Sequence, residues 1–200
     1  QTVTGLTNGT TYHFSFFTRK GSTWSTGVTT TATPSAGTLL LEENFNYTAG
    51  TALTANAWNV TGTTATPVVS VNNNAGLTFN NYGPVSAGNG VTLATSGQDV
   101  NKTFTAQTSG NVYAAFLVSV ISAQTGDYFV NLGPNPMSTT FRGRVYVKTT
   151  TGGIQFGLAF NTESATYSST VFSLATTYLL VLKYEIVSGS DDKVHLFVFE

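Results

Sequence analysis

Pairs of carboxylates deserve first consideration, because two acidic side chains on one side of a sugar bond can hydrolyse it. In retaining glycosidases the two carboxyl groups lie about 5 Å apart, which on a β-strand requires acidic residues at alternate positions. Glu42–Glu43 and Asp191–Asp192 are instead adjacent pairs, and neighbours on a strand point to opposite faces. Cysteine is absent, and the two histidines, His13 and His195, lie far apart in the sequence. We therefore predict a non-catalytic protein, with a glycoside hydrolase as a distant alternative.

One polar strand face carries residues suited to binding without catalysis. In the segment FRGRVYVK, residues 141–148, arginine and tyrosine alternate with apolar residues and are predicted to share one face. Aromatic rings can stack on a sugar ring, and planar guanidinium groups can hydrogen-bond its hydroxyls. The candidate ligand-binding residues are Tyr128, Arg142, Arg144, Tyr146 and Tyr82. The alternative is a solvent-facing strand that carries charge for solubility.

Asp127 is the single candidate metal ligand. It follows Gly126 in a turn, where its carboxylate could bind calcium together with loop carbonyls. The alternative is an aspartate that accepts a hydrogen bond from a turn amide. We predict no cofactor other than this possible structural calcium.

Charge is scarce along the whole chain. Among 200 residues there are 8 Lys+Arg and 9 Asp+Glu, so charged residues make up 8%, against about 25% in ordinary soluble domains. Scattered cations of this number predict no nucleic-acid partner. No apolar run approaches the length of about 18 residues that a spanning helix needs, so we expect no membrane insertion. The absence of cysteine and the abundance of Thr, Ser, Asn and Gly suit a secreted or cell-surface bacterial protein.

The apolar segments along the whole chain predict β-strands. Thr, Val, Tyr and Phe dominate them, and Gly, Asn and Ser separate them at intervals typical of an all-β sandwich. Residues 112–122, VYAAFLVSVIS, are apolar at both parities, which predicts a central strand covered on both faces. TYLLVLKYEIV and KVHLFVFE, on either side of a turn at 188–192, predict an antiparallel hairpin.

Residues 1–34 resemble the last strands of a fibronectin type III domain. Leu6, Asn8-Gly9-Thr10 and Tyr12 match the corner of that family, where the tyrosine hydroxyl hydrogen-bonds back across the turn. Trp24-Ser25 and the closing Thr33-Pro34 match its last hairpin and exit. The resemblance implies a partial immunoglobulin-like sandwich, followed by a linker of small residues at 35–38.

Residues 39–200 resemble a concanavalin A-like jelly roll of the laminin-G type. The motifs, in order, are EENFNY, GQDVNKTF, YAAFLVSV, GDYFVNLG and the late hairpin YLLVLKYEIVSGSDDKVHLFV. The resemblance implies an antiparallel β-sandwich, truncated at its C-terminal end.

Tandem fibronectin-like and laminin-G-like modules imply a place within a larger secreted bacterial protein. We expect a non-catalytic binding or adhesion module whose partner is a glycan or a cell-surface protein, next to other domains of the same chain. The alternative is a purely structural spacer that positions a neighbouring enzyme or adhesin.

Overall fold

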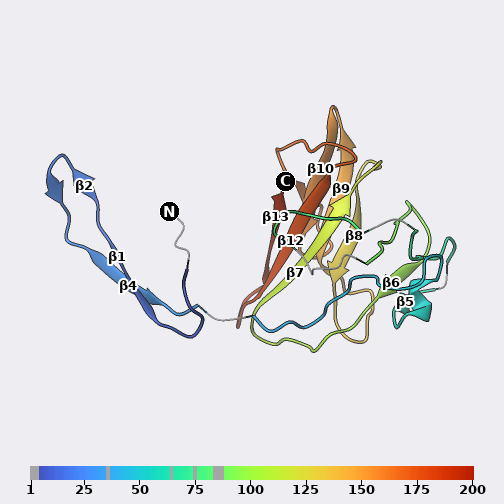
Figure 1. Cartoon of the computed structure of the whole chain (residues 1–200), viewed down its shortest axis with the longest axis horizontal. Coiled ribbons are helices and arrows are strands. Elements are labelled where there is room, and N and C mark those ends of the chain that lie inside the picture. Colours follow the sequence, from blue (N-terminus) through green and yellow to red (C-terminus); the bar gives the residue numbers. More distant parts are fainter. Residues whose placement is uncertain (1–4, 35–36, 64, 74–75, 83–87) are drawn as a thin grey trace. The chain divides into compact units, whose positions relative to one another are not determined.

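The protein is all-β, with antiparallel pairing in every sheet (Figure 1). The computed structural model describes residues 5–34, 37–63, 65–73, 76–82 and 88–200. The chain divides into two compact units, Gln1–Leu40 and Leu41–Glu200. Residues 1–4 of the predicted first domain and residues 35–36 of the predicted linker lie outside the described residues.

The first unit is a long two-stranded ribbon. β1 (Tyr12–Phe16) pairs with β4 (Val28–Ala32), and β2 (Arg19–Lys20) pairs with β3 (Thr23–Trp24) at the tip. The hydroxyl oxygen of Tyr12 accepts a hydrogen bond from the N–H of Thr7 at 2.9 Å. The predicted bond across the turn is therefore confirmed.

Two sheets face each other in the second unit. The four-stranded sheet has the order β11 (Thr166–Tyr167), β10 (Gly153–Ala159), β9 (Arg142–Thr150) and β8 (Asp127–Leu132). The three-stranded sheet has the order β13 (Lys193–Phe199), β12 (Thr177–Ile186) and β7 (Gly110–Ser119). The predicted antiparallel hairpin is confirmed as β12 and β13.

The core lies between these two sheets, as the alternating strand patterns require. The residues packed there, each at most 1% exposed, are Val145, Ile154 and Phe156 from the four-stranded sheet and Tyr178, Leu180 and Leu182 from the three-stranded sheet. Because residues of opposite parity point outward, each strand offers its other face to solvent. This packing makes the second unit a β-sandwich.

The prediction for residues 112–122 is wrong in one respect. β7 forms one edge of the three-stranded sheet, and β12 occupies the centre. Tyr113, on the outer face of β7, is 60% exposed. Apolar residues at both odd and even positions of β7 therefore do not mean that both faces of the strand are buried.

A second, smaller core stabilises the first third of this unit. Here the chain forms the short helix η1 (Leu53–Ala55) and the paired strands β5 (Asn59–Thr61) and β6 (Asp99–Asn101). Leu53, Val69 and Val71 are buried together. Irregular backbone in this region is thus held by its own apolar cluster.

Candidate functional site

Three tyrosines form one row across the outer face of the four-stranded sheet. Tyr128 of β8 lies directly opposite Tyr146 of β9, which lies opposite Gly157 of β10, which lies opposite Tyr167 of β11. The Tyr128 and Tyr146 ring centroids are 5.7 Å apart, and those of Tyr146 and Tyr167 are 6.4 Å apart, both edge to face. We call these three residues the tyrosine row.

Two glycines allow the Tyr167 ring to lie against the backbone. A Cβ added at Gly157 would stand 2.7 Å from a ring carbon of Tyr167, and one added at Gly126 would stand 2.4 Å from its hydroxyl oxygen. The Tyr167 side chain therefore extends over β10 and reaches the start of β8. The Tyr167 ring thus forms a platform along the sheet, with the Lys148 ammonium group over it.

Two cations flank the tyrosine row. The guanidinium carbon of Arg144 lies 5.2 Å from the Tyr128 ring centroid and 5.7 Å from that of Phe141. The ammonium nitrogen of Lys148 lies 4.1 Å from the centroid of Tyr167. All three distances fall within the range of cation–π attraction. Among the described residues, the buried Nε of Arg144 has no hydrogen-bond partner.

The hydroxyls of Tyr128 and Tyr167 stay protonated at neutral pH. Burial raises the pKa of Tyr128, which Arg144 opposes, and burial also raises the pKa of Tyr167. A protonated phenol both donates and accepts hydrogen bonds. The row therefore combines apolar rings, neutral hydroxyls and fixed positive charge.

Arg142 does not join the tyrosine row, contrary to the prediction. Gly143 has a φ of +56°, which interrupts the strand alternation directly after Arg142. The Arg142 guanidinium lies 5.3 Å from the Phe160 centroid and donates to Oδ1 of Asn161 at 2.7 Å. The Phe160 ring in turn packs 6.2 Å from Tyr184 of the opposite sheet. Arg142 thus closes one end of the sandwich.

Tyr82 also lies apart from the row. Its hydroxyl donates a hydrogen bond to the carbonyl oxygen of Ala115 at 2.9 Å. Ala115 belongs to β7 in the three-stranded sheet, whereas the row crosses the other sheet. Of the five predicted ligand-binding residues, the structure brings Tyr128, Arg144 and Tyr146 together.

Asp127 uses its carboxylate locally. Oδ1 accepts a hydrogen bond from the N–H of Tyr128 at 2.8 Å. Within the part of the chain that the structure describes, no group of three acidic or histidine side chains could hold a metal ion. Calcium binding by Asp127 stays a prediction.

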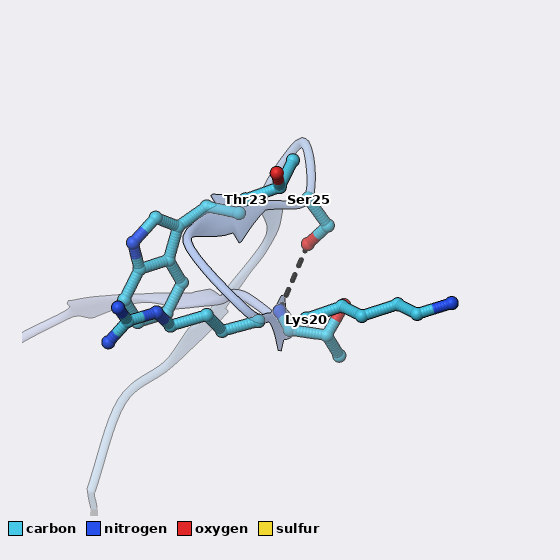
Figure 2. A pocket seen from close by; sticks show the side chains of 6 residues that line it. Lys20, Thr23 and Ser25 are labelled. Atoms are coloured by element: carbon cyan, nitrogen blue, oxygen red, sulfur yellow. Dashed lines mark hydrogen bonds between the residues drawn. The ribbon is translucent and has the colours of Figure 1, made fainter.

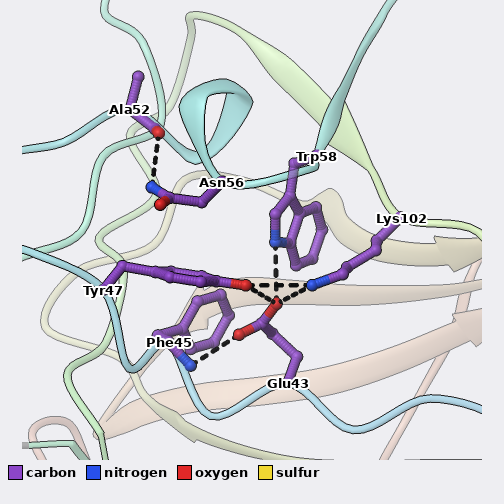
Figure 3. A network of polar contacts seen from close by, with 7 residues as sticks. All are labelled: Glu43, Phe45, Tyr47, Ala52, Asn56, Trp58 and Lys102. Atoms are coloured by element: carbon purple, nitrogen blue, oxygen red, sulfur yellow. Dashed lines mark hydrogen bonds and ion pairs between the residues drawn. The ribbon is translucent and has the colours of Figure 1, made fainter.

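A polar network around Glu43, not predicted from the sequence, lies in the second core (Figure 3). One oxygen of Glu43 accepts from the N–H of Phe45 at 2.8 Å, and the other accepts from the hydroxyl of Tyr47 and the indole of Trp58. Lys102 binds that second oxygen at 2.5 Å. Burial raises the pKa of Glu43, but Lys102 and the other donors outweigh it and hold the pKa below its usual value.

The Glu43 network has the character of a structural element. The Glu43 side chain is 12% exposed, and the Phe45 ring stacks on Trp58 at 6.0 Å. Four donors converge on one carboxylate, so its capacity to accept hydrogen bonds is used within the protein. Within the described residues, the Glu43 carboxylate, the Lys102 ammonium group and the Tyr47 hydroxyl bind one another, as expected of a structural network.

An open hollow also lies at the tip of the first unit, beside Lys20, Thr23 and Ser25 (Figure 2). The Trp24 ring is part of its lining, and the Arg19 guanidinium lies over that ring at 5.4 Å. Trp24 is 60% exposed. The hollow belongs to a hairpin tip and contains no acidic group.

Searches against protein-family models, curated proteins and solved structures gave no match. Among the described residues, no helix is long and apolar enough to cross a membrane.

Proposed function

We propose that this chain is a non-catalytic carbohydrate-binding module whose site is the tyrosine row with Arg144 and Lys148. The observation that carries the proposal is the register of the four-stranded sheet, which aligns Tyr128, Tyr146 and Tyr167 across the strands on an outer face. A linear row of rings suits a linear chain of sugar rings.

The chemistry of the row supports this ligand class. Sugar rings have apolar C–H faces that pack on aromatic rings, and hydroxyls that need donors and acceptors. The tyrosine hydroxyls supply both, and Arg144 and Lys148 supply fixed donors at either side of the row. Neighbouring acidic groups, Asp99 and Asp127, act electrostatically on Tyr128 and can accept hydrogen bonds from sugar hydroxyls.

The setting of this module follows from the sequence motifs. We propose a fibronectin type III-like segment joined to a laminin-G-like jelly roll, within a secreted or cell-surface bacterial protein. The Tyr12 hydrogen bond supports the first assignment, and the two packed antiparallel sheets support the second. Partners would be a glycan or a glycosylated cell-surface protein, and other domains of the same chain.

A structural spacer is the second candidate, and one observation favours it. Arg144 lies over the Tyr128 ring and Lys148 lies over the Tyr167 ring. Those cations occupy ring faces that a sugar would otherwise stack upon. In a spacer, the same contacts serve to stabilise the sheet.

A polysaccharide panel separates the two functions. The full chain would be tested against immobilised neutral and acidic polysaccharides, in parallel with Tyr146→Ala and Tyr167→Ala. If the chain is a binding module, both variants should lose binding to the polysaccharide that the parent chain binds. Tyr113→Ala, which removes an exposed tyrosine from the other sheet, should keep that binding. Absence of binding to every polysaccharide would leave the spacer as the function.

A further inference from the structure

The two cations beside the tyrosine row lack counter-charges. Arg144 and Lys148 belong to β9, two residues to either side of Tyr146. Alternate residues of a strand are about 7 Å apart, so one cation lies on each long side of the row. Within the described parts of the chain, neither cation forms an ion pair. An uncompensated cation beside aromatic rings is suited to an anionic ligand.

Arg144 is held in place by rings. Its guanidinium carbon lies 5.2 Å from the Tyr128 centroid and 5.7 Å from the Phe141 centroid, and these two centroids are 5.9 Å apart. Its Nε is buried and has no hydrogen-bond partner among the described residues. A guanidinium fixed by packing loses little entropy when its terminal N–H groups bind two oxygens of one anionic group.

Two carboxylates close to the row already accept hydrogen bonds from the backbone. Asp127, which acts electrostatically on Tyr128, accepts the N–H of that residue at 2.8 Å. Glu163, on which Arg144 acts electrostatically, accepts backbone N–H groups of its own turn. Neither of these carboxylates pairs with Arg144 or Lys148. The row therefore keeps positive charge that a ligand can neutralise.

The positions of the cations favour an acidic sugar over a neutral one. The guanidinium of Arg144 and the ammonium of Lys148 lie over ring faces of the row. A neutral sugar could stack on those faces only by displacing the cations, whereas an anionic group would pair with them where they are. Over the Tyr146 ring, the described residues place no cation. That ring remains for a sugar to pack on.

We propose that the ligand of the tyrosine row is an acidic polysaccharide, whose carboxylate or sulfate groups pair with Arg144 and Lys148 while a sugar ring packs on Tyr146. The proposal rests on the carbohydrate-binding function and names the ligand class within it. Because the cations flank both long sides of the row, a polysaccharide lying along it could pair anionic groups that project to either side. Carboxylates and sulfates both offer two oxygens to a guanidinium, so experiment has to separate them.

Polysaccharides that differ only in charge test the proposal with the unmodified chain. Polygalacturonate would be compared with its methyl ester, and dextran sulfate with dextran, by titration calorimetry. We expect at least one charged polymer to bind about tenfold tighter than its neutral counterpart, and to bind more weakly as NaCl rises from about 0.05 M to about 0.5 M. Preference for polygalacturonate would identify the anionic group as a carboxylate, and preference for dextran sulfate would identify it as a sulfate.

The same titrations can fail in two distinguishable ways. Equal binding to the charged and neutral members of both pairs, or tighter binding to the neutral members, would overturn the proposal and leave the carbohydrate-binding function intact. Absence of binding to all four polymers would also overturn it. The wider polysaccharide panel would then decide whether the carbohydrate-binding function survives.

Variants that remove single charges test where the anion binds. Arg144→Gln and Lys148→Gln should each weaken binding to the preferred acidic polymer by about tenfold. Lys20→Gln, which makes the same change in net charge in the first unit, is the matched control and should bind like the parent chain. Circular dichroism verifies the fold of all three. An equal loss in Lys20→Gln would mean attraction to the chain as a whole and would overturn the proposed site.

Asp99 provides a test of opposite sign. This exposed residue of β6 acts electrostatically on Tyr128, so its carboxylate would repel an anionic ligand at the row. We therefore expect Asp99→Asn to tighten binding to the acidic polymer by about threefold. A neutral sugar could use Asp99 only as a hydrogen-bond acceptor and would gain nothing from its loss. Unchanged or weaker binding in Asp99→Asn would contradict an acidic ligand.

Discussion

Two of the clusters in which cations meet aromatic rings, both in the second unit, differ in what surrounds the cation. Lys102 lies over Tyr47 and Trp58 and also binds Glu43. Arg144 and Lys148 lie over the tyrosine row, and neither forms an ion pair within the described parts of the chain. The first cluster is complete within the fold. The second has charge and hydrogen-bonding capacity left over, which is the condition for recognising a ligand.

The largest expected loss of stability comes from removing the carboxylate of the first cluster, which is the complete one. Glu43→Ala leaves Lys102 and the Trp58 N–H without their acceptor in a partly buried position. We expect the free energy of unfolding to fall by about 3 kcal/mol, measured by urea denaturation. Glu185→Ala, which removes the carboxylate of the surface pair with Lys183, is the control. An equal loss in both variants would contradict the distinction between the clusters.

A glycine substitution tests the platform of the second cluster. Gly157→Ala places a Cβ against the Tyr167 ring, and we expect it to displace the ring, weaken carbohydrate binding and cost about 1–3 kcal/mol of stability. Gly37→Ala is the control, since a Cβ there meets no atom within 4 Å. Unchanged binding in Gly157→Ala would mean that the position of Tyr167 is irrelevant to the ligand.

Acid should weaken the complete cluster. The pKa of Glu43 is lower in the folded chain than its usual value of 4.5, so the unfolded chain binds its proton first as pH falls. The stability from Glu43 is therefore fully present above about pH 4.5 and is lost as pH falls through the folded pKa. Denaturation curves from pH 6 to pH 3 should show this loss in the parent chain and a smaller loss in Glu43→Gln. Parallel pH profiles would contradict the prediction.

The smallest stability effect belongs to Arg144. Its substitution by methionine removes a cation–π contact but also removes a buried Nε that has no partner among the described residues. We expect a change of at most about 1 kcal/mol in unfolding free energy, together with weaker carbohydrate binding. A large destabilisation with intact binding would favour the spacer function.

Local patterns predicted the strands and one face of the site. The alternation in residues 177–199 correctly gave the β12–β13 hairpin, because each strand has one buried face. The alternation in residues 141–148 also correctly placed Arg144 and Tyr146 on one face of β9. The prediction that Arg142 shares this face is wrong, because the positive φ of Gly143 breaks the alternation. The sequence alone does not show which glycines in a strand adopt a positive φ.

Contacts between residues far apart in the sequence could not be predicted from the hydrophobic periodicity. Glu43 and Lys102 are 59 residues apart, and no periodicity connects them. Tyr167 joins Tyr146 only because Gly157 lies between them in the sheet. The apolar run of β7 suggested a central strand, but strand order depends on how the whole chain folds back, which composition does not encode.

The two tryptophans give each unit its own optical reporter. Trp24 is largely exposed in the first unit, whereas Trp58 is stacked on Phe45 and hydrogen-bonded to Glu43 in the second. With no other indole in the chain, replacing either one by phenylalanine isolates the emission of the other. Unfolding of the second unit should then shift the Trp58 spectrum toward the red, while the already water-exposed Trp24 changes little.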